Sequence, residues 1–405
     1  MIDIKSVRSN FPVLAQKVYG KQLVYFDNGA TTQKPQHVIN AVNEAYSTYY
    51  SNIHRGVHSL SDITSEKYEN SRERVKSFIN ASSKEEIVFT SGTTASINLV
   101  AFSFGERYIK QDDEVIISGL EHHANIVPWQ MMCERKNARL RVIPVNDDGS
   151  LRLEKLDNLI NEKTRIIAVT QVSNALGVIV PVKKIINKAH ENNVPVLVDG
   201  AQGIQHGHVD VQDLDCDFYA FSGHKIYGPT GIGVLYGKRK WLEKLPPYQG
   251  GGDMVDRVSF EKTTYNELPF KFEAGTTNFV GAIGLAAALD YIESIGIPDI
   301  INYEHELTEY SNKKLNETGG IKIYGDVNEK ISIMSFIIEK VHQYDAGMIL
   351  DKMGIAVRTG SHCAQPVMTR YGIDGTIRAS MCFYNTKEEI DMLIKGIEKV
   401  REMML

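Results

Sequence analysis

The sequence predicts an α/β protein: a large domain on a mostly parallel sheet of about seven strands, and a smaller C-terminal α/β domain. The first observation is that, from about residue 85, short apolar runs alternate with polar, helix-like segments. The second is that β-branched and aromatic residues dominate those runs, as they do in buried parallel strands. The runs are residues 87–90, 114–118, 140–145, 165–170, 195–199, 217–222 and 231–236.

The pattern changes after Gly237, and the rest of the chain predicts different elements. Residues 246–280 are rich in Pro, Gly and Thr, which is typical of a long irregular connection. Residues 281–295 carry apolar side chains at helical spacing and predict a helix. Apolar runs at 333–338 and 377–381 predict strands of a second sheet.

We expect two domains, because a typical domain holds roughly 100–200 residues and this chain has 405. Residues 21–280 are assigned to the large domain. Residues 281–405 are assigned to the small domain, and residues 1–20 are expected to join it. Active sites of such sheets lie outside the carboxyl ends of the strands, so we expect functional residues there.

Composition limits the possible functions. The net charge is −5 and the sequence pI is about 6.2, so nothing favours a nucleic acid or a membrane as partner. The four cysteines form no CxxC pair and no histidines cluster at zinc spacing, so no metal site is expected. The first residues lack a signal-peptide layout and the cysteine usage fits a reducing compartment, so we expect a cytoplasmic protein.

The segment around Lys225 is the strongest local signal for chemistry. A strand is expected to end at Ser222, and a turn rich in Gly and Pro then brings Lys225 to the mouth of the sheet. A lysine that binds pyridoxal 5'-phosphate (PLP) as a Schiff base needs this position, partly desolvated so that its amine is neutral. Ser222 and His224 flank it with donors suited to a phosphate. A solvated lysine on a surface turn is the alternative.

A carboxylate at the end of the preceding strand favours the cofactor lysine. Asp199 ends the apolar run 195–199, where it would pair with a pyridinium nitrogen and make the ring an electron sink. Gln202 lies within reach of the phenolic oxygen of such a cofactor. The alternative for Asp199 is a helix N-cap. Its place one strand before Lys225 favours the functional interpretation.

Two further strand ends carry polar groups. Thr93 and Thr94 open a helix after the run 87–90, and free N–H groups with hydroxyls at a helix N-terminus suit a phosphate. This signal is weak alone, since Ser and Thr cap many helices. His122 follows the run 114–118 and is expected to stack on an aromatic ring and carry protons. A metal site with His123 is the alternative, but no third ligand has suitable spacing.

With these groups in chain order, the sequence resembles the class V aminotransferase-like enzymes of PLP fold-type I. Within that family it is similar to cysteine desulfurases of the SufS type. The resemblance covers essentially the whole chain and includes residues 25–30, 52–58 and 273–278. It implies a fold-type I PLP-dependent transferase.

The resemblance implies a role for each matching residue. The implied phosphate contacts are Thr93, Thr94, Ser222 and His224, with Thr277 from a partner subunit. The implied ring contacts are His122 over the ring, Asp199 at the pyridine nitrogen and Gln202 near the phenolic oxygen, beside Lys225. The implied substrate-binding residues are Asn174, Arg358, Arg378 and His54.

A cysteine in a polar loop points to sulfur chemistry. Cys363 follows a short strand, and nearby Arg358 and His362 are expected to favour its reactive thiolate form. The other three cysteines lie in helical or strand patterns and are interpreted as buried hydrophobes. The loop matches the desulfurase group with a short catalytic loop. This chain departs from the family pattern at Ser361, where His is more common, and at Ser91 and Ala95.

The function implied by the resemblance is a PLP-dependent cysteine desulfurase. It would convert L-cysteine to L-alanine, form a persulfide on Cys363 and supply sulfur for iron–sulfur cluster assembly. The expected catalytic residues are Lys225, Cys363 and His122, in a homodimer that passes sulfur to a SufE- or SufU-like acceptor. Three alternatives stay open: a selenocysteine lyase, another class V reaction such as transamination or epimerisation, and a sulfur-carrying scaffold.

Overall fold

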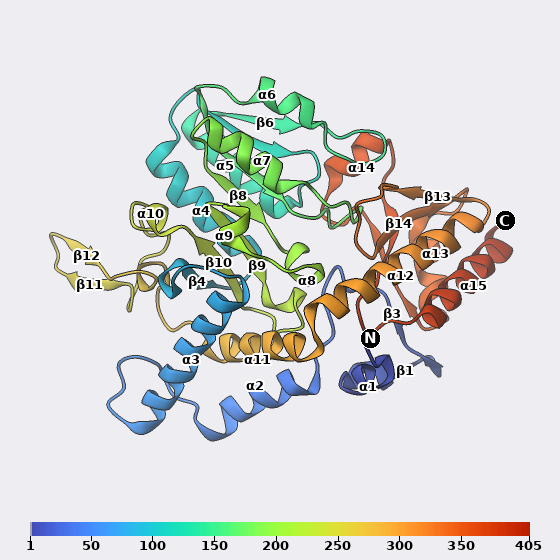
Figure 1. Cartoon of the computed structure of the whole chain (residues 1–405), viewed down its shortest axis with the longest axis horizontal. Coiled ribbons are helices and arrows are strands. Elements are labelled where there is room, and N and C mark those ends of the chain that lie inside the picture. The colour runs from blue at the N-terminus through green and yellow to red at the C-terminus, as the bar shows by residue number, and fades with distance from the viewer. Residues whose placement is uncertain (1) are drawn as a thin grey trace.

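A seven-stranded sheet forms the centre of the larger body of the molecule (Figure 1). This computed structural model describes residues 2–405, so Met1, which the sequence assigns to the small domain, lies outside the described residues. The strand order is β4-β10-β9-β8-β7-β5-β6, and only β10 runs antiparallel to its neighbours. Each of the seven predicted runs is a strand, and the predicted fold class is confirmed. The strands are β4 (Ile87–Thr90), β5 (Glu114–Ser118), β6 (Arg139–Ile143), β7 (Thr164–Thr170), β8 (Val196–Asp199), β9 (Phe218–Ser222) and β10 (Gly233–Gly237).

Both faces of this sheet are covered except at the edge strand β6, which explains why its inner strands are mostly apolar. Successive residues point to opposite faces, so Ile116 packs in one core cluster while Val115 and Ile117 pack in another. The first cluster includes α3 (Ser59–Phe78) and α7 (Val182–Glu191), and the second includes α4 (Thr93–Tyr108) and α5 (Val127–Lys136). Helices on both faces are what parallel strands with crossover connections require.

A four-stranded antiparallel sheet forms the smaller body, in the order β13-β14-β17-β16. The predicted strands 333–338 and 377–381 are found as β14 and β17. The strands are β13 (Ile321–Tyr324), β14 (Ile333–Ile338), β16 (Arg358–Gly360) and β17 (Thr376–Ser380), with helices α12 (Ile297–Glu317), α13 (Gln343–Lys352) and α15 (Lys387–Met404). α15 begins with a capping box between Thr386 and Glu389, which satisfies backbone donors of its first turn.

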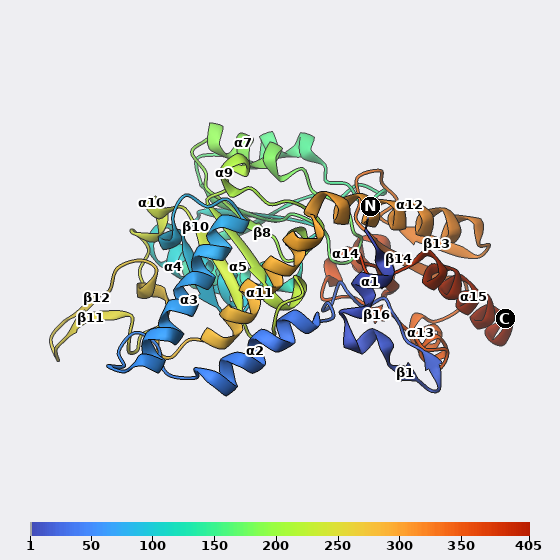
Figure 2. The same cartoon turned by 60° about the horizontal axis from the view of Figure 1, so that its bottom comes forward.

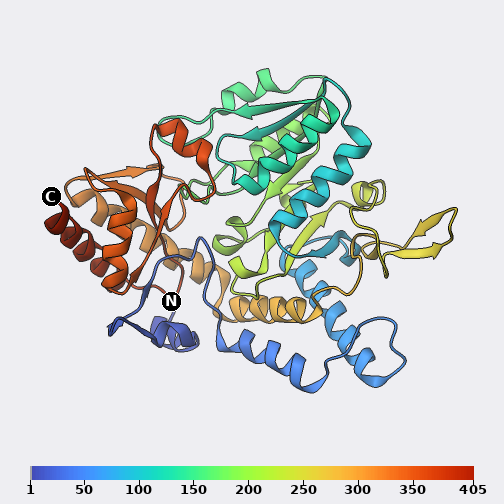
Figure 3. The same cartoon turned by 180° about the vertical axis from the view of Figure 1, so that it is seen from behind.

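The N-terminal segment runs along the smaller body before it enters the larger one (Figure 3). Its strand β3 (Val24–Tyr25) pairs in parallel with β15 (Ile355–Ala356). The chain then continues into α2 (Gln36–Thr48), which packs against the predicted helix of the second half, α11 (Phe279–Ile295). α11 also packs against α3. The domain boundaries assigned from the sequence stay a prediction.

The sequence predicts that the segment 246–280 is irregular, but the structure shows that part of it is regular. It contains a hairpin of β11 (Val255–Val258) and β12 (Thr263–Tyr265) that projects from the larger body (Figure 2). In the described part of the chain, these strands pair only with each other. Most of their side chains are exposed, so no apolar alternation marks them in the sequence.

Short elements complete the described chain. They are α1 (Ile4–Ser9), β1 (Lys17–Val18), β2 (Lys21–Gln22), α6 (Leu156–Leu159), α8 (Gly203–His206), α9 (Val211–Leu214), α10 (Arg239–Leu242) and α14 (Gln365–Tyr371). Within residues 2–405, no single helix is long and apolar enough to span a membrane. The pair α11 and α12, bent by 78°, passes the same test by length and composition only.

A buried ion pair ties α3 to the segment that precedes α11. Arg72 is fully buried, and its guanidinium donates to both carboxylate oxygens of Glu273 at 2.7 and 2.9 Å. The Phe89 amide and the Tyr68 hydroxyl donate to the same carboxylate at 2.7 and 2.8 Å. Arg72 also donates to the Ile87 carbonyl at 2.8 Å and to the Glu69 carboxylate at 3.3 and 3.4 Å, so its guanidinium is fully bonded, as a buried charge requires.

We expect Glu273→Gln to lower the free energy of unfolding by about 3–5 kcal/mol, because it removes the buried counter-charge of Arg72 and leaves only the partly exposed carboxylate of Glu69. Urea unfolding followed by circular dichroism measures the change. The matched control is Glu402→Gln, which breaks the exposed pair with Lys399. Surface pairs contribute about 0–1 kcal/mol, so equal losses in the two variants would contradict the interpretation.

Candidate active site

A cavity of about 490 Å³ lies at the carboxyl ends of the large sheet's strands, next to β16 and β17. Each predicted strand-end group reaches it from a separate element, since parallel strands end at the same edge. Thr93 opens α4, His122 follows β5, Asp199 ends β8 and Lys225 follows β9. The predicted residues that line it are Thr93, Thr94, His122, Asn174, Asp199, Gln202, Ser222, His224, Lys225, Arg358, Cys363 and Arg378.

Lys225 lies in a short turn after β9, with its amine directed to the N-terminal segment. Its Nζ donates to the carbonyl oxygen of Gly29. Gln202 Nε2 donates to the same oxygen at 2.7 Å, and Gln202 Oε1 is buried without a partner among the described residues. Burial, and then the charge of Arg378, lowers the pKa of Lys225 to about 7. A large fraction of this amine is therefore neutral at neutral pH and able to attack a carbonyl.

Asp199 places a carboxyl group deep in the same cavity. Its Oδ1 accepts from the Ala201 amide at 3.0 Å, and burial raises its pKa to about 6. The Lys225 charge opposes that rise. At neutral pH the group is largely ionised, so it offers a negative charge in a place of low dielectric.

Hydroxyl and backbone donors meet where α4 begins. The Ser222 hydroxyl accepts from the Thr93 amide at 2.8 Å and lies 2.7 Å from the Thr93 hydroxyl. The start of this 16-residue helix adds free N–H groups and a partial positive charge. Burial lowers the pKa of nearby His224 to about 4, so its ring is neutral.

His122 is held in one tautomer by the turn that follows it. Its Nδ1 accepts from the Ala124 amide at 3.0 Å, so a neutral ring carries its proton on Nε2. Burial, and then the charge of Lys225, lowers its pKa to about 4. Beneath this turn lies Glu121, whose role the sequence did not reveal. Burial raises its pKa to about 8, and it accepts from Asn125 at 2.7 Å and Thr170 at 2.9 Å.

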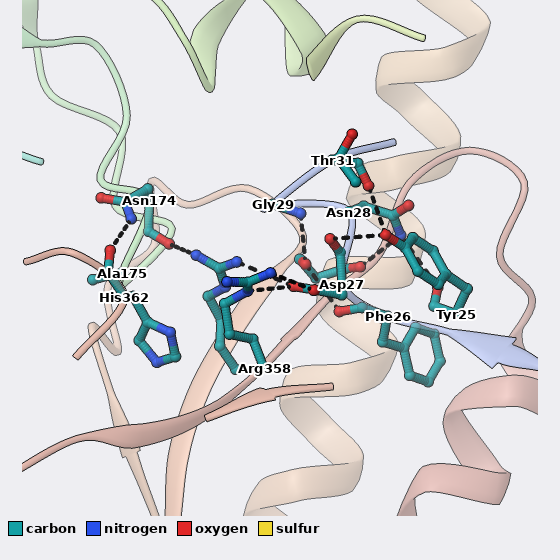
Figure 4. Close-up of polar contacts among 12 residues, drawn as sticks. Tyr25, Phe26, Asp27, Asn28, Gly29, Thr31, Asn174, Ala175, Arg358 and His362 are labelled. Atoms are coloured by element: carbon teal, nitrogen blue, oxygen red, sulfur yellow. Dashed lines mark hydrogen bonds and ion pairs between the residues drawn. The ribbon is translucent and has the colours of Figure 1, made fainter. Parts of the chain in front are cut away.

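Two arginines line the cavity from the small sheet, and Figure 4 shows Arg358 beside Asp27. The Arg378 guanidinium is buried and donates to the Asn174 carbonyl at 2.9 Å, while its Nε has no partner among the described residues. Burial lowers its pKa to about 10, so it remains charged at neutral pH. Asp27 accepts from Arg358 at 2.9 and 3.0 Å and from Arg378 at 3.4 Å. The sequence did not predict this role of Asp27.

The Cys363 loop is held against the larger body through its backbone. The Cys363 carbonyl accepts from the His123 amide at 2.8 Å, and the His362 carbonyl accepts from Asn174 Nδ2 at 2.7 Å. His362 and Cys363 have φ of 55° and 54°, a left-handed conformation that costs about 1–2 kcal/mol per residue. These anchors offset that cost, and they give His123 a structural role that the sequence did not indicate.

One expectation for this loop is wrong. His362 was expected to favour the Cys363 thiolate, but it is buried, and its Nε2 lies 2.9 Å from the Thr376 hydroxyl. Burial lowers its pKa to about 3, so the ring is neutral and supplies no positive charge. The prediction for the four cysteines is confirmed, since Cys363 is exposed and the other three are buried.

Two predicted residues do not line this cavity. The Thr277 hydroxyl donates to the Tyr68 hydroxyl at 3.2 Å and lies in a separate pocket of about 270 Å³. His54 has a φ of 68° and packs its ring against Tyr68 and Phe270. The roles predicted for Thr277 and His54 stay predictions. Among the described residues, no group of three or more His, Cys, Asp or Glu side chains is arranged to hold a metal ion.

The residues of this cavity fit pyridoxal phosphate. Lys225 offers a partly neutral amine, Asp199 a buried carboxylate, and Gln202 Oε1 a buried polar atom without a partner. The Thr93 and Ser222 hydroxyls at the start of α4 suit a phosphate. The fold and this site together define a PLP-dependent enzyme of fold type I.

Comparison with known proteins identifies the family. The model of the aminotransferase class-V family matches residues 24–393, and the chain belongs to that family. It is 49% identical to a cysteine desulfurase of Escherichia coli strain K12 over 405 residues, which is 100% of both proteins. A longer cysteine desulfurase of Synechococcus elongatus is 49% identical over 399 residues, which make up 98% of this chain and 64% of that protein. The apo structure of a cysteine desulfurase from Thermococcus onnurineus NA1 matches with a TM-score of 0.94 and 39% identity, over 100% of this chain and 99% of that chain.

We expect the protein stripped of its cofactor to take up added PLP at a rate that rises with pH through about 7, because the Lys225 amine must be neutral to react. The return of visible absorbance measures that rate. Nα-acetyl-lysine in the same buffers controls for the pH dependence of PLP itself. A rate that rises only toward the ordinary lysine value of 10.5 would contradict the lowered pKa.

Proposed function

We propose that this chain is a PLP-dependent cysteine desulfurase that converts L-cysteine to L-alanine and carries the sulfur as a persulfide on Cys363. The observation that carries the proposal is that an exposed thiol and the Lys225 amine line one cavity. The cysteine desulfurases to which the chain is similar support it. A transaminase or an epimerase has no use for such a thiol, and a sulfur-carrying scaffold has no use for Asp199 beside Lys225.

Substrate binding is proposed for the two arginines and Asn174. Arg378 keeps a free Nε donor, and a planar guanidinium pairs well with a carboxylate. Arg358 reaches the cavity from the neighbouring strand. These side chains would hold the substrate α-carboxylate on the side of the cavity formed by the small sheet, and so direct its amine toward Lys225.

Proton transfer is proposed for Lys225 and His122. PLP bound here would supply an electron sink for the substrate Cα, with Asp199 keeping the ring nitrogen protonated. The Lys225 amine, with its pKa lowered to about 7, is suited to take the Cα proton. The neutral His122 ring carries a proton on Nε2 that it can give to the substrate side.

The sulfur transfer is proposed for the Cys363 thiolate. It forms an S–S bond with the substrate sulfur while the Cβ–S bond breaks. The electron pair of that bond stays on carbon, which takes up a proton and becomes the methyl group of alanine. L-cysteine and the Cys363 thiol thus become L-alanine and a Cys363 persulfide, with no added oxidant or reductant.

We expect Cys363→Ala to keep the visible absorbance of bound PLP and to lose cysteine desulfuration, because only the sulfur acceptor is removed. Lys225→Ala should lose both. Alanine formation measures turnover, and mass spectrometry after cysteine treatment locates the added sulfur. The matched control is Cys133→Ala, since Cys133 is buried and its pKa is raised to about 11. Strong sulfide release by Cys363→Ala would exclude the role of Cys363, and selenocysteine turnover retained there would favour a selenocysteine lyase.

A homodimer is also proposed. Large apolar side chains are exposed around α2 and α3, which would favour their burial against a second copy. Among them are Tyr46, Tyr50, Val57, Leu60 and Ile63. Thr277 lies outside the Lys225 cavity of its own chain, which supports its donation to the cavity of a partner.

We expect co-expressed Lys225→Ala and Thr277→Val chains to form a hybrid in which one site per dimer is intact. That site combines Lys225 of one chain with Thr277 of the other. Cysteine turnover by the isolated hybrid, compared with each variant alone, measures the recovery. A hybrid with no more turnover or PLP retention than the Thr277→Val protein would contradict donation between subunits, and a monomer in light scattering would contradict the dimer.

The remaining proposals concern the physiological setting. We propose that the protein belongs to the SufS-type group, because residues 361–364 between β16 and α14 form a short loop. The exposure of Cys363 supports transfer of its sulfur to a SufE- or SufU-like protein for iron–sulfur cluster assembly. Four free cysteines support a reducing compartment, the cytoplasm.

A further inference from the structure

Two like charges lie directly opposite each other at the side of the cavity formed by the small sheet. Arg358 on β16 and Arg378 on β17 are register partners in an antiparallel pair. Such partners have Cβ atoms about 4.5–5.5 Å apart, and like charges at that spacing destabilise a sheet. Arg378 is buried, so water screens its charge poorly. The pair therefore needs a counter-charge.

Asp27 supplies that counter-charge to both arginines (Figure 4). Its carboxylate accepts from Arg358 Nε at 3.0 Å and from Arg358 Nη2 at 2.9 Å, a bidentate contact that fixes the plane of the guanidinium. Its Oδ1 also accepts from Arg378 Nη2 at 3.4 Å. These contacts leave Arg378 Nε without a partner within residues 2–405.

The backbone around Asp27 is held to the end of β17, so the carboxylate has a defined position. Asp27 forms a parallel bridge with Ser380. The Phe26 carbonyl accepts from the Ser380 amide at 2.7 Å, and the Gly29 amide donates to the Ser380 hydroxyl at 2.7 Å. Gly29 also packs closely on Arg378, since an added Cβ would lie 3.2 Å from Arg378 Cζ and the guanidinium would have to shift.

The same segment contacts the Lys225 side of the cavity. The Gly29 carbonyl accepts from Lys225 Nζ, and from Gln202 Nε2 at 2.7 Å. Residues 26–29 therefore link the arginine pair to Lys225, the residue that would hold the cofactor with which the substrate amine reacts. A substrate amino acid must reach both the arginine pair and the Lys225 side of the cavity. Residues 26–29 set the distance between these two places.

We infer that Asp27 is a positioning residue that holds Arg358 and Arg378 together as one carboxylate-binding pair. The inference rests on the proposed function, in which that pair binds the substrate α-carboxylate. Asp27 acts through the two arginines, so its replacement should weaken the binding of ligands that carry a carboxylate and leave other ligands unaffected. A residue that merely supported the fold would weaken all ligands alike.

Equilibrium binding to the PLP-loaded protein tests this selectivity. L-alanine carries the carboxylate and ethylamine is the same amine without it, and both are followed by the change in visible absorbance. We expect Asp27→Asn to weaken L-alanine about tenfold, equal to about 1.4 kcal/mol, and to leave ethylamine unchanged. The KM for cysteine should rise more than kcat falls. The matched control is Asp147→Asn, which breaks the exposed pair with Arg370 and should change neither ligand.

The outcomes distinguish a failure of the role of Asp27 from a failure of the proposed carboxylate site. Equal weakening of both ligands, or no change in either, would overturn the role of Asp27. Arg378→Lys in the same assay tests the carboxylate site itself. Loss of selectivity in Arg378→Lys but not in Asp27→Asn would overturn the role of Asp27 alone. Retained selectivity in Arg378→Lys would overturn the proposed carboxylate site and, with it, the inference.

A charge-relief variant keeps the inference testable if Asp27→Asn folds poorly. We expect Asp27→Asn to lower the thermal midpoint and the double variant Asp27→Asn, Arg358→Gln to recover part of that loss. The recovery follows because one of the two opposed charges is gone, and it appears as non-additivity in a double-mutant cycle. Strictly additive losses would show that Asp27 does not neutralise the pair, and would overturn the inference.

Discussion

The parallel pairing of β7, β8 and β9 is the constraint on which the rest of the site depends. Because these strands run in one direction, their carboxyl ends meet at one edge of the sheet. Asp199 and Lys225 are 26 residues apart in the chain, yet Asp199 ends β8, Lys225 follows the neighbouring β9, and both line one cavity. The crossover helices bury both faces of these three strands, so the groups at their ends are held by a close-packed core.

Burial of charge is the second constraint. It shifts the pKa values of the buried titratable groups in the cavity in favour of their uncharged forms. It lowers the pKa of Lys225 to about 7 and raises that of Asp199 to about 6, so at neutral pH an amine partly neutral and a carboxylate largely ionised share one cavity. The same effect keeps the His122 ring neutral. Such displaced pKa values in one cavity are typical of catalytic sites.

The N-terminal segment joins the two bodies at the site. It pairs with β15 of the smaller body, places Asp27 between two arginines, and presents the Gly29 carbonyl to Lys225. The Cys363 loop belongs to the smaller body and contacts the larger one, since the Cys363 carbonyl accepts from the His123 amide in the turn after His122. Contacts from both bodies thus hold the two sides of the site together, and the Cys363 thiol remains exposed.

The sequence by itself determined the strands of the large sheet, the placement of Lys225 and Asp199 in one cavity, and the exposure of Cys363. These signals are local, because each apolar run and the polar residues that follow it lie within a few positions of each other. Only the tertiary structure decided the roles of Asp27, Glu121 and His123 and the neutrality of His362. Asp27 meets Arg358 across 331 residues of chain, and no local pattern encodes such a contact. The neutral ring of His362 follows from burial, which depends on what packs around it.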